Sequence, residues 1–232
     1  MIKTYTGNKL TVFMLSVGDH PIGLKAIPLL RKSLPPHELV IWNNGSSKEH
    51  AENLRSLCDV FMNSSHNMWT SKGFGYALLY LEYEWLIISA PDIVVRDDWW
   101  KFVEPHMKRP EVGIIGDCMK PDRELGSWEL SNPDSLPDGI TLWRKEMIND
   151  VGGISPSFGI WGHDLLDLQI RAWNAGWKIV NIHTGLIHTG DGHTGVDAVK
   201  KELGEKRFDE MHSRSCRALK SIRKNWWVLT TP

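Results

Sequence analysis

The sequence predicts an α/β domain built around a mostly parallel sheet, and three observations lead to this fold class. Short apolar runs alternate with helix-like segments through the first half of the chain. Several of these runs end directly in polar turns, as the strands of a doubly wound sheet do. The 232 residues are enough for one large domain with a sizeable core. We therefore expect a Rossmann-like central sheet flanked by helices, in a single domain spanning residues 1–232.

Apolar runs bounded by turn residues give the expected elements. The expected strands cover residues 10–17, 38–42, 59–62, 85–89, 112–115, 140–143 and 179–182. The expected helices cover residues 23–33, 48–57, 70–81, 97–107, 144–151 and 164–175. Residues 43–47 are expected to form a turn, and residues 117–137 a long polar loop. Because ligands bind at the carboxyl ends of parallel strands, the polar strand ends at residues 19–20, 43–44 and 92 should converge on one crevice.

The composition is that of an ordinary globular protein, with 41% hydrophobic and 24% charged residues. A net charge of -1 gives no overall attraction to nucleic acids or membranes. The three cysteines are scattered, which fits neither a disulfide framework nor a zinc site and indicates a reducing, cytoplasmic location. The longest apolar stretch, residues 78–95, is interrupted by acidic residues, so we expect no transmembrane segment.

Residues 161–178 carry the most specific local pattern. If residues 164–175 form a helix, one stripe about 80° wide is polar, and it contains Asp164, Asp167, Arg171 and Asn174. The other positions are almost all apolar, whereas a solvated surface helix has a wide polar face. We therefore expect a helix that is buried on most sides and ends at Gly176, which fits the left-handed position after a helix.

Asp167 and Arg171 are spaced to form an ion pair, which leaves Asp164 without an obvious local partner. Asp164 then has two interpretations. As an acid in the first turn of a helix, it would only offset the helix dipole. As a functional carboxylate, it would point into a crevice after the Trp161-Gly162 loop. We favour the second interpretation because the helix is mostly apolar.

Asp92 and three histidines are the candidate metal ligands. Asp92 follows the most hydrophobic strand, where a carboxylate can bind a divalent cation, although a simple turn role after Pro91 fits equally well. His183, His188 and His193 are evenly spaced in a glycine-rich loop, but no cysteine joins them. We expect one histidine to complete a site begun by carboxylates elsewhere.

Taken in order, these motifs resemble the inverting GT-A-fold glycosyltransferases of family 2, especially the rhamnosyltransferase-like members. The run L-V-I-W-N-N-G-S-S is similar to the strand of that family that ends in D-N-G-S. The run L-I-I-S-A-P-D is similar to the strand that ends in D-x-D or N-P-D. The run W-G-H-D-L-L-D-L-Q-I-R-A-W-N-A-G resembles the motif G-E-D-x-D-L-x-x-R-x-x-x-A-G and is the most specific of these matches. The resemblance covers roughly residues 10–195.

The resemblance implies transfer of a sugar, with inversion, from a UDP-, GDP- or dTDP-linked donor to an acceptor hydroxyl. The acceptor would be a glycan, a lipid-linked sugar or another hydroxyl compound, and a divalent cation, Mn2+ or Mg2+, would assist. Residues 1–116 would bind the donor, residues 117–195 would hold the acceptor and the catalytic groups, and residues 196–232 would form a basic C-terminal helix.

The resemblance also assigns roles to individual residues. Asp164 takes the position of the catalytic base, Asp92 that of the metal-binding acid, and His188 that of the loop histidine that reaches the metal. Asn43 takes the position that contacts the nucleotide base. The implied donor site comprises Ser16, Gly18, Asn43, Asn44, Lys72, Gly73, Ala90, Pro91 and Asp92. The implied acceptor site comprises Trp161, Gly162, His163 and His193.

Three positions depart from the family pattern and keep an alternative open. Ala90 replaces the first residue of D-x-D, His163 replaces a glutamate beside the base, and Asn43 replaces an aspartate. A catalytically impaired module that binds a nucleotide sugar or a glycan would tolerate these changes. A nucleotidyltransferase is disfavoured, because residues 16–20 lack a glycine-rich phosphate loop with a basic residue.

The tail, residues 197–229, is predicted to be helical and basic. Its charged and apolar stripes contain Arg217, Lys220 and Lys224, and Leu219, Ile222 and Trp226, respectively. We favour a helix that packs on the domain. Two other roles stay open, which are contact with a membrane surface that carries a lipid-linked glycan and contact with the phosphates of a nucleic-acid acceptor.

Overall fold

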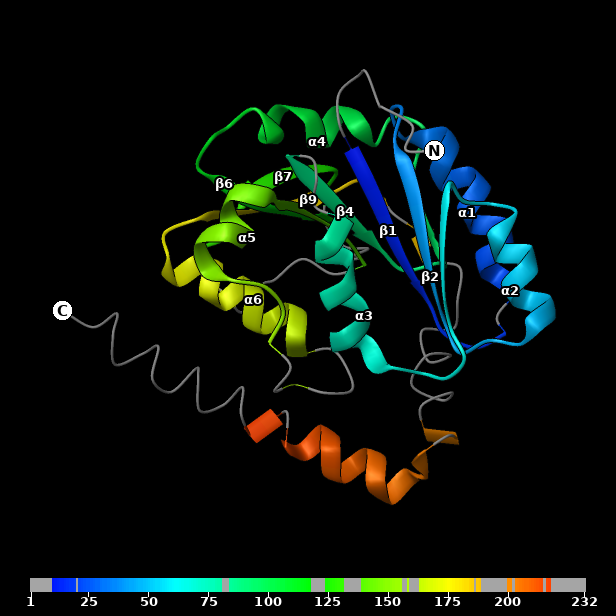
Figure 1. Ribbon diagram of the computed structural model, residues 1–232. Helices are drawn as coiled ribbons and strands as arrows, with labels where there is room; N and C mark the ends of the chain where they lie inside the picture. Colours follow the sequence, from blue (N-terminus) through cyan, green and yellow to red (C-terminus); the bar gives the residue numbers. More distant parts are fainter. Residues whose placement is uncertain are drawn as a thin grey trace.

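A computed structural model gives the architecture of the chain (Figure 1). It describes residues 10–19, 21–80, 84–117, 124–131, 139–155, 158, 163–185, 187–188, 200–201, 203–214 and 216–217. Within these ranges the chain forms a layered α/β structure, with one large sheet between two groups of helices.

The large sheet has eight strands in the order β3-β2-β1-β4-β8-β6-β9-β7. The strands are β1 (Leu10–Ser16), β2 (Glu38–Asn44), β3 (Val60–Ser64), β4 (Trp85–Ser89), β6 (Val112–Asp117), β7 (Gly126–Glu129), β8 (Ile140–Arg144) and β9 (Lys178–His183). Strands β3, β2, β1 and β4 are parallel neighbours, and β6 is parallel to β9. The antiparallel strand β8 lies between β4 and β6, and β7 pairs antiparallel with β9 at the edge. The sheet is therefore mixed and mostly parallel, as predicted.

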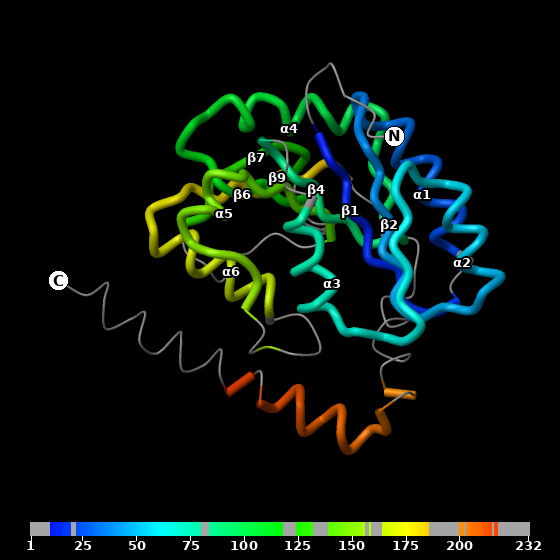
Figure 2. Tube along the Cα trace, viewed as in Figure 1, coloured from blue at the N-terminus to red at the C-terminus, as the bar shows by residue number. Residues whose placement is uncertain are grey.

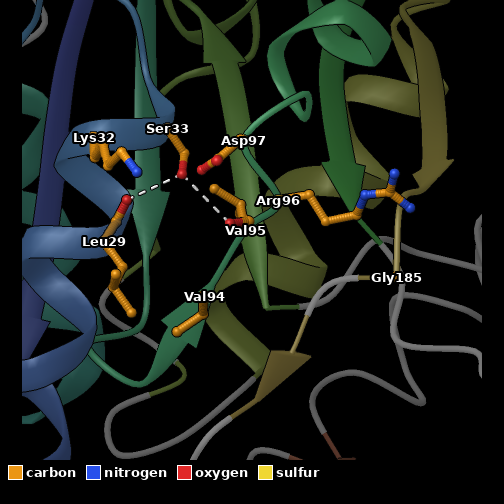
Figure 3. Close-up of a pocket in the computed structure, with 8 residues that line it drawn as sticks. All are labelled: Leu29, Lys32, Ser33, Val94, Val95, Arg96, Asp97 and Gly185. Atoms are coloured by element: carbon orange, nitrogen blue, oxygen red, sulfur yellow. Dashed lines mark hydrogen bonds between the residues drawn. The ribbon is translucent and has the colours of Figure 1, made fainter.

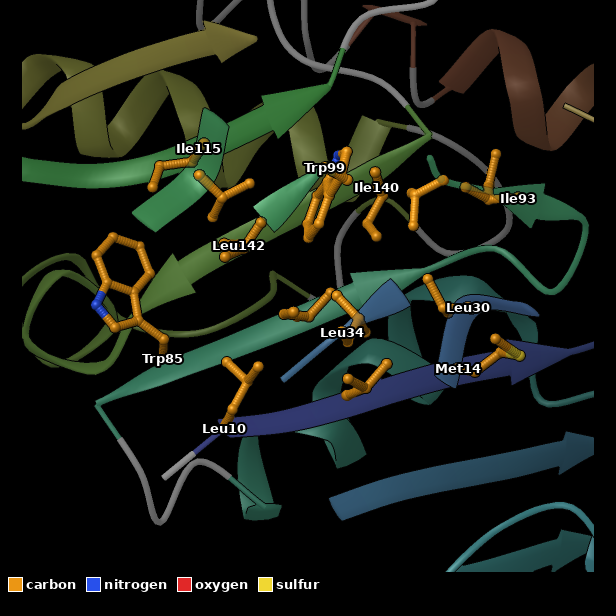
Figure 4. Packing of buried hydrophobic residues seen from close by; sticks show 14 of the residues in the cluster. Leu10, Met14, Leu30, Leu34, Trp85, Ile93, Trp99, Ile115, Ile140 and Leu142 are labelled. Atoms are coloured by element: carbon orange, nitrogen blue, oxygen red, sulfur yellow. The ribbon is translucent and has the colours of Figure 1, made fainter. Parts of the chain in front are cut away.

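Two apolar layers cover the two faces of the sheet, because successive side chains of a strand point to opposite faces. The helices are α1 (Pro21–Ser33), α2 (Lys48–Arg55), α3 (Trp69–Ala77), α4 (Trp100–Met107), α5 (Lys145–Val151) and α6 (His163–Asn174), with a 3-10 turn, η1, at Leu78–Tyr80. One layer joins the sheet to α1, α2 and α4, and Figure 4 shows part of it. The other joins the sheet to α3, α5 and α6, which group together in Figures 1 and 2.

A short antiparallel ribbon stands apart from the large sheet. It pairs β5 (Ile93–Val94) with β10 (Ile187–His188), so that Ile187 is opposite Val94 and His188 is opposite Ile93. The ribbon packs on the α1 side of the fold, because Ile93 belongs to the same apolar layer as Ile27 and Leu30 of α1.

The structure corrects several predicted boundaries. Asn43 and Asn44 are the last residues of β2 and are buried, so they do not belong to a turn. The polar segment 117–137 contains strand β7, and it begins with Asp117, which is the last residue of β6. The helix expected at residues 97–107 begins at Trp100. The ribbon of β5 and β10 was not predicted, since two residues per strand leave no periodicity to detect.

The α6 prediction is confirmed apart from a shift of one residue, His163–Asn174 instead of 164–175. Leu168, Ile170 and Ala172 are buried, and Gly176 has a positive φ of 90° after the helix end. Within the described ranges, no helix is long and apolar enough to cross a membrane.

Candidate active site

The carboxyl ends of β2, β1 and β4 lie side by side in the sheet, because these strands are parallel neighbours. The predicted neighbourhood of these strand ends is thereby confirmed, whereas the crevice that they should line stays a prediction. Ser16, at the end of β1, is buried, and Gly18 follows it with a positive φ of 68°. Asp19 accepts a hydrogen bond from the backbone N–H of Ser47 at 2.6 Å, which ties the turn after β1 to the segment after β2. This bond also lowers the pKa of Asp19.

Asp164 lies in the first turn of α6, and its side chain is fully buried at 0% exposure. Oδ1 accepts the backbone N–H of Leu165 at 3.0 Å. Oδ2 has no hydrogen-bond partner among the described residues. A buried carboxylate oxygen without a partner is costly to maintain, so its presence indicates a use other than stability.

Burial raises the pKa of the Asp164 carboxyl group above its usual value of 3.8. The backbone N–H of Leu165 and the hydroxyl groups of Ser71 and Thr70 partly offset this rise. Both hydroxyls come from the first turn of α3, which therefore faces the start of α6. Ser71 Oγ is near enough to influence the carboxyl group but makes no hydrogen bond within the described residues. Asp164 Oδ2 and Ser71 Oγ thus form a polar pair ready for a further hydrogen-bonding group.

Asp167, one turn further along α6, has a different role. Arg171 donates Nε–H to Asp167 Oδ2 at 2.9 Å, so the predicted ion pair is confirmed. Arg171 also donates to the backbone carbonyls of Val151 and Gly153, at 2.6 and 2.7 Å, and so ties α6 to the loop after α5. Asp167 is therefore occupied in a structural contact, whereas Asp164 Oδ2 has no partner in the part of the chain that the structure describes.

The two asparagines at the end of β2 are buried and hydrogen-bonded. Asn43 donates Nδ2–H to Asn63 Oδ1 at 2.7 Å, and its Oδ1 accepts the Ser46 hydroxyl. Asn44 donates to Asn67 Oδ1 at 2.9 Å and accepts the backbone N–H of Met68 at 2.7 Å. Asn44 therefore holds the segment that leads into α3. Its place in a donor site, like that of Asn43, stays a prediction.

Two glycines near the crevice are needed for close packing. An added Cβ at Gly45, where φ is 88°, would lie 2.6 Å from the backbone N of Asn67. An added Cβ at Gly73 would lie 2.6 Å from Leu15 Cδ1, so α3 packs directly on β1 at that point. Lys72, beside it, is exposed. Close packing on Leu15 therefore explains why residue 73 is a glycine. The donor contacts expected for Lys72 and Gly73 stay predictions.

Asp92 and His188 are brought together by the backbone of the ribbon. His188 pairs with Ile93, so it stands opposite the residue next to Asp92. Asp92 is partly buried and follows Ala90 and Pro91 after β4. Carboxylate and imidazole together suit Mn2+ and related divalent cations, so the donor set is chemically suitable for a cation, and the metal site at Asp92 and His188 stays a prediction. In the part of the chain that the structure describes, no cluster of three or more potential ligand side chains is present.

A second buried carboxyl group lies at the end of β6. Asp117 accepts hydrogen bonds from Trp99 Nε1 at 2.9 Å and from Thr184 Oγ1 at 2.5 Å, both on Oδ2. The backbone N–H of Thr184 donates to Oδ1 at 3.3 Å. Burial raises the pKa of Asp117, although these hydrogen bonds and the nearby His183 oppose the rise. His183, the end of β9, is itself buried.

The C-terminal segment reaches the same region. Residues 205–214 are helical, and Phe208 is buried in a small apolar cluster with Trp69, Leu203 and Met211 (orange helix in Figure 1). Trp69 opens α3 with a positive φ of 69°, which is rare for a bulky residue. The favoured interpretation of the tail, a helix packed on the domain, therefore holds for these residues. Lys220, Lys224 and Trp226 lie outside the described residues.

Several predicted site residues also fall outside the described part. These are Trp161, Gly162 and His193, together with the side chains of His163 and His188. Other residues of the site were not predicted, namely Ser71, Trp99, Asp117 and Thr184. Asp117 follows an apolar run as Asp92 does, and this was the one signal for it in the sequence.

No protein-family model and no curated protein sequence matches this chain. Its fold, however, is similar to that of solved glycosyltransferases. A mannosyltransferase from Pyrobaculum calidifontis, in complex with GDP-Man and Mn2+, superposes with a TM-score of 0.63 at 13% identity, covering 88% of this chain and 64% of that one. GalNAc-T7, with UDP, GalNAc and Mn2+, gives a TM-score of 0.62 at 12% identity, covering 87% and 49%.

A third similar structure is glucosyl-3-phosphoglycerate synthase from Mycobacterium tuberculosis, in complex with Mn2+, UDP and glucosyl-3-phosphoglycerate. It gives a TM-score of 0.61 at 11% identity, covering 85% of this chain and 79% of that one. This chain spans less than two thirds of the length of the first two structures. The chain therefore has the GT-A fold, and at such low identity the similarity extends to the fold alone.

Proposed function

We propose that this chain is a glycosyltransferase that moves a sugar from a nucleotide-sugar donor to an acceptor hydroxyl, with inversion and with Asp164 as the general base. The observation that carries the proposal is the Asp164 carboxyl group at the start of α6, which is fully buried and whose Oδ2 has no hydrogen-bond partner among the described residues. A general base needs a lone pair that no protein donor occupies, and it works best with a pKa raised towards neutrality. Burial raises the pKa of Asp164 in that direction.

The reaction is a single displacement. Asp164 Oδ2 accepts the proton of the acceptor hydroxyl while that oxygen forms a bond to the anomeric carbon. The bond between the anomeric carbon and the diphosphate breaks on the opposite face, which inverts the configuration. Ser71 Oγ is placed to orient the acceptor oxygen, since it faces the Asp164 carboxyl group and has no partner of its own in the described residues.

The donor side of the proposal rests on the ends of β1, β2 and β4. Asp92 and His188 would hold a divalent cation, Mn2+ or Mg2+, because the ribbon places His188 opposite Ile93. Such a cation balances the negative charge of the leaving diphosphate. The predicted nucleotide contacts of Ser16, Gly18 and Asn43 belong to the same proposal, and the similar structures, which hold GDP-Man or UDP with Mn2+, support it.

A reducing, cytoplasmic setting completes the proposal and rests on the three cysteines, which are scattered and odd in number and so fit no disulfide framework. The acceptor stays unassigned among a glycan, a lipid-linked sugar and another hydroxyl compound.

The test is a panel of UDP-, GDP- and dTDP-sugars with and without Mn2+. Thermal stabilisation identifies the donor, and release of the nucleoside diphosphate measures turnover. We expect one nucleotide class to raise Tm in the presence of Mn2+ and to be hydrolysed slowly without an acceptor. Binding without any hydrolysis or transfer would favour the alternative, a non-catalytic module that binds nucleotide sugars.

A further inference from the structure

The Asp117 carboxyl group is buried as deeply as that of Asp164, yet the proposed reaction does not use it. It ends β6 and points to the same face of the sheet as Ile115, because side chains alternate along a strand. That face carries α4 and the β5–β10 ribbon, whereas Asp164 lies on the side of α3 and α6. The two carboxyl groups therefore lie on different sides of the sheet.

The hydrogen-bond partners of Asp117 lie in the segments that connect the two ribbon strands to the rest of the fold. Trp99 lies between β5 and α4, and its indole N–H donates to Asp117 Oδ2 at 2.9 Å. Thr184 lies between β9 and β10 and donates twice, through Oγ1 to Oδ2 at 2.5 Å and through its backbone N–H to Oδ1 at 3.3 Å. One carboxylate thus binds both the segment that follows β5 and the segment that precedes β10.

The ribbon depends on such an anchor. A two-stranded ribbon is marginally stable by itself, and this one has two residues in each strand. Beside it lies a pocket of about 250 Å³, shown in Figure 3, where α1 leaves a gap next to residues 94–97 and Gly185. In that region Ser33 Oγ donates to the backbone carbonyl of Val95 at a long 3.4 Å. The hydrogen bonds that Asp117 Oδ2 accepts from Trp99 Nε1 and Thr184 Oγ1 are shorter.

We propose that Asp117 is a positioning residue, which fixes the β5–β10 ribbon and thereby holds Asp92 and His188 in register for a divalent cation. The inference rests on the proposed function for the identity of the ligand, and on the hydrogen bonds of Asp117 for the anchor. Loss of a group that orients metal ligands typically lowers metal affinity about 10- to 100-fold. We expect a loss of that size for Asp117→Asn, since an amide cannot accept from all three donors.

The experiment measures Mn2+ binding and ribbon order in the same variants. Free Mn2+ is followed by electron paramagnetic resonance during titration in the presence of UDP and, separately, of GDP. Hydrogen–deuterium exchange reports the backbone amides of residues 93–94 and 187–188. Asp117→Asn and Thr184→Val are expected to weaken Mn2+ binding and to speed exchange in the ribbon, whereas Thr184→Ser keeps the hydroxyl and should behave as the wild type.

Arg144→Gln is the control for a general loss of stability. Arg144 is buried at the end of the inner strand β8, beside the first residues of β4 and β6, where it pairs with Trp85 and donates to the backbone carbonyls of Val112 and Met107. We expect this variant to lose stability while Mn2+ affinity is unchanged. Equal Mn2+ affinity in Asp117→Asn, Thr184→Val and the wild type would overturn the inference. So would a loss of affinity in Arg144→Gln as large as in Asp117→Asn.

The wild-type titration separates this inference from the proposed function. A wild-type protein that binds no Mn2+ with either nucleotide contradicts the proposed cation site. Ribbon exchange then still decides the role of Asp117 as an anchor, because unchanged exchange in Asp117→Asn would refute it and faster exchange would support it.

Discussion

The two faces of the large sheet carry two carboxyl groups that are equally buried but differ in their hydrogen bonds. Asp164 and Asp117 both have 0% exposure, and burial raises the pKa of both. Asp117 accepts three hydrogen bonds from Trp99 and Thr184. Asp164 accepts one backbone N–H from Leu165 and keeps Oδ2 without a partner among the described residues.

The difference separates a carboxylate whose oxygens are both hydrogen-bonded from the one that we propose as the base. Burial costs an ionised group free energy, and hydrogen bonds recover that cost when they occupy both oxygens. Asp117 recovers this free energy through its hydrogen bonds to Trp99 and Thr184, which lie in two different segments of the chain. Asp164 does not, since within the described ranges its Oδ2 has no partner, and the proposed function gives that oxygen to the substrate. Burial alone, or a raised pKa alone, would not distinguish the two residues.

The largest effect is expected from Asp164→Asn. The amide keeps the shape of the side chain and can still accept the Leu165 N–H, but it cannot take a proton. Transfer should therefore fall about 10²- to 10⁴-fold while donor binding persists, since that is the usual cost of losing a positioned base. Steady-state transfer rates and donor calorimetry measure the two quantities. Near-normal transfer here, together with complete loss in Asp167→Asn, would move the base one turn along α6.

Asp92→Asn is expected to weaken Mn2+-dependent donor binding more than it lowers the rate of transfer. Replacing the carboxylate removes a charged ligand, so the Mn2+-dependent gain in donor affinity should fall at least about tenfold. Calorimetry of the donor with Mn2+, and again with EDTA, isolates that gain. A variant that keeps the full gain would show that Asp92 is only a turn residue.

Ser71→Ala should give a smaller effect on the Asp164 side. The Ser71 hydroxyl lowers the pKa of Asp164, so its removal raises that pKa. Because the base acts in its deprotonated form, the acidic limb of the kcat/KM profile should move to higher pH, with a rate loss below about tenfold. An unchanged acidic limb would exclude contact between the two groups in the working enzyme.

Both carboxyl groups also make the stability of the protein depend on pH. Both carboxyl groups have a pKa above the ordinary 3.8 in the folded protein, so the folded state binds their protons more tightly than the unfolded chain does. Their contribution to stability is complete below pH 3.8 and is lost as the pH rises through the folded-state pKa.

At neutral pH, Asp164→Asn removes a buried charge with a free oxygen and should stabilise the protein by about 1 kcal/mol. Asp117→Asn leaves buried donors without an acceptor and should destabilise it by about 1–3 kcal/mol. Urea unfolding at pH 7 measures both changes. Two changes of the same sign would remove the distinction between the carboxyl groups.

Much of this protein is determined by local sequence. Strand β4 was predicted at its observed bounds because four apolar residues are followed by Ser89 and the stop at Ala90-Pro91-Asp92, and α6 was predicted from its apolar positions and Gly176. The pairing of Asp167 with Arg171 follows from helix geometry alone, and so did the singling out of Asp164. The fold class follows as well, since the alternation of strands and helices is a property of the chain itself.

The tertiary structure decided what no local pattern contains. Asp117 and Asp92 both follow apolar runs in the sequence, and only the sheet order and the ribbon register place one beside Thr184 and the other beside His188. Strand β8, inserted antiparallel between β4 and β6, brings the two halves of the chain into one sheet. The facing of Ser71 and Asp164 likewise joins two helices far apart in sequence. Hydrogen bonds between distant segments depend on how the elements pack, because the local sequence around a donor does not identify its acceptor.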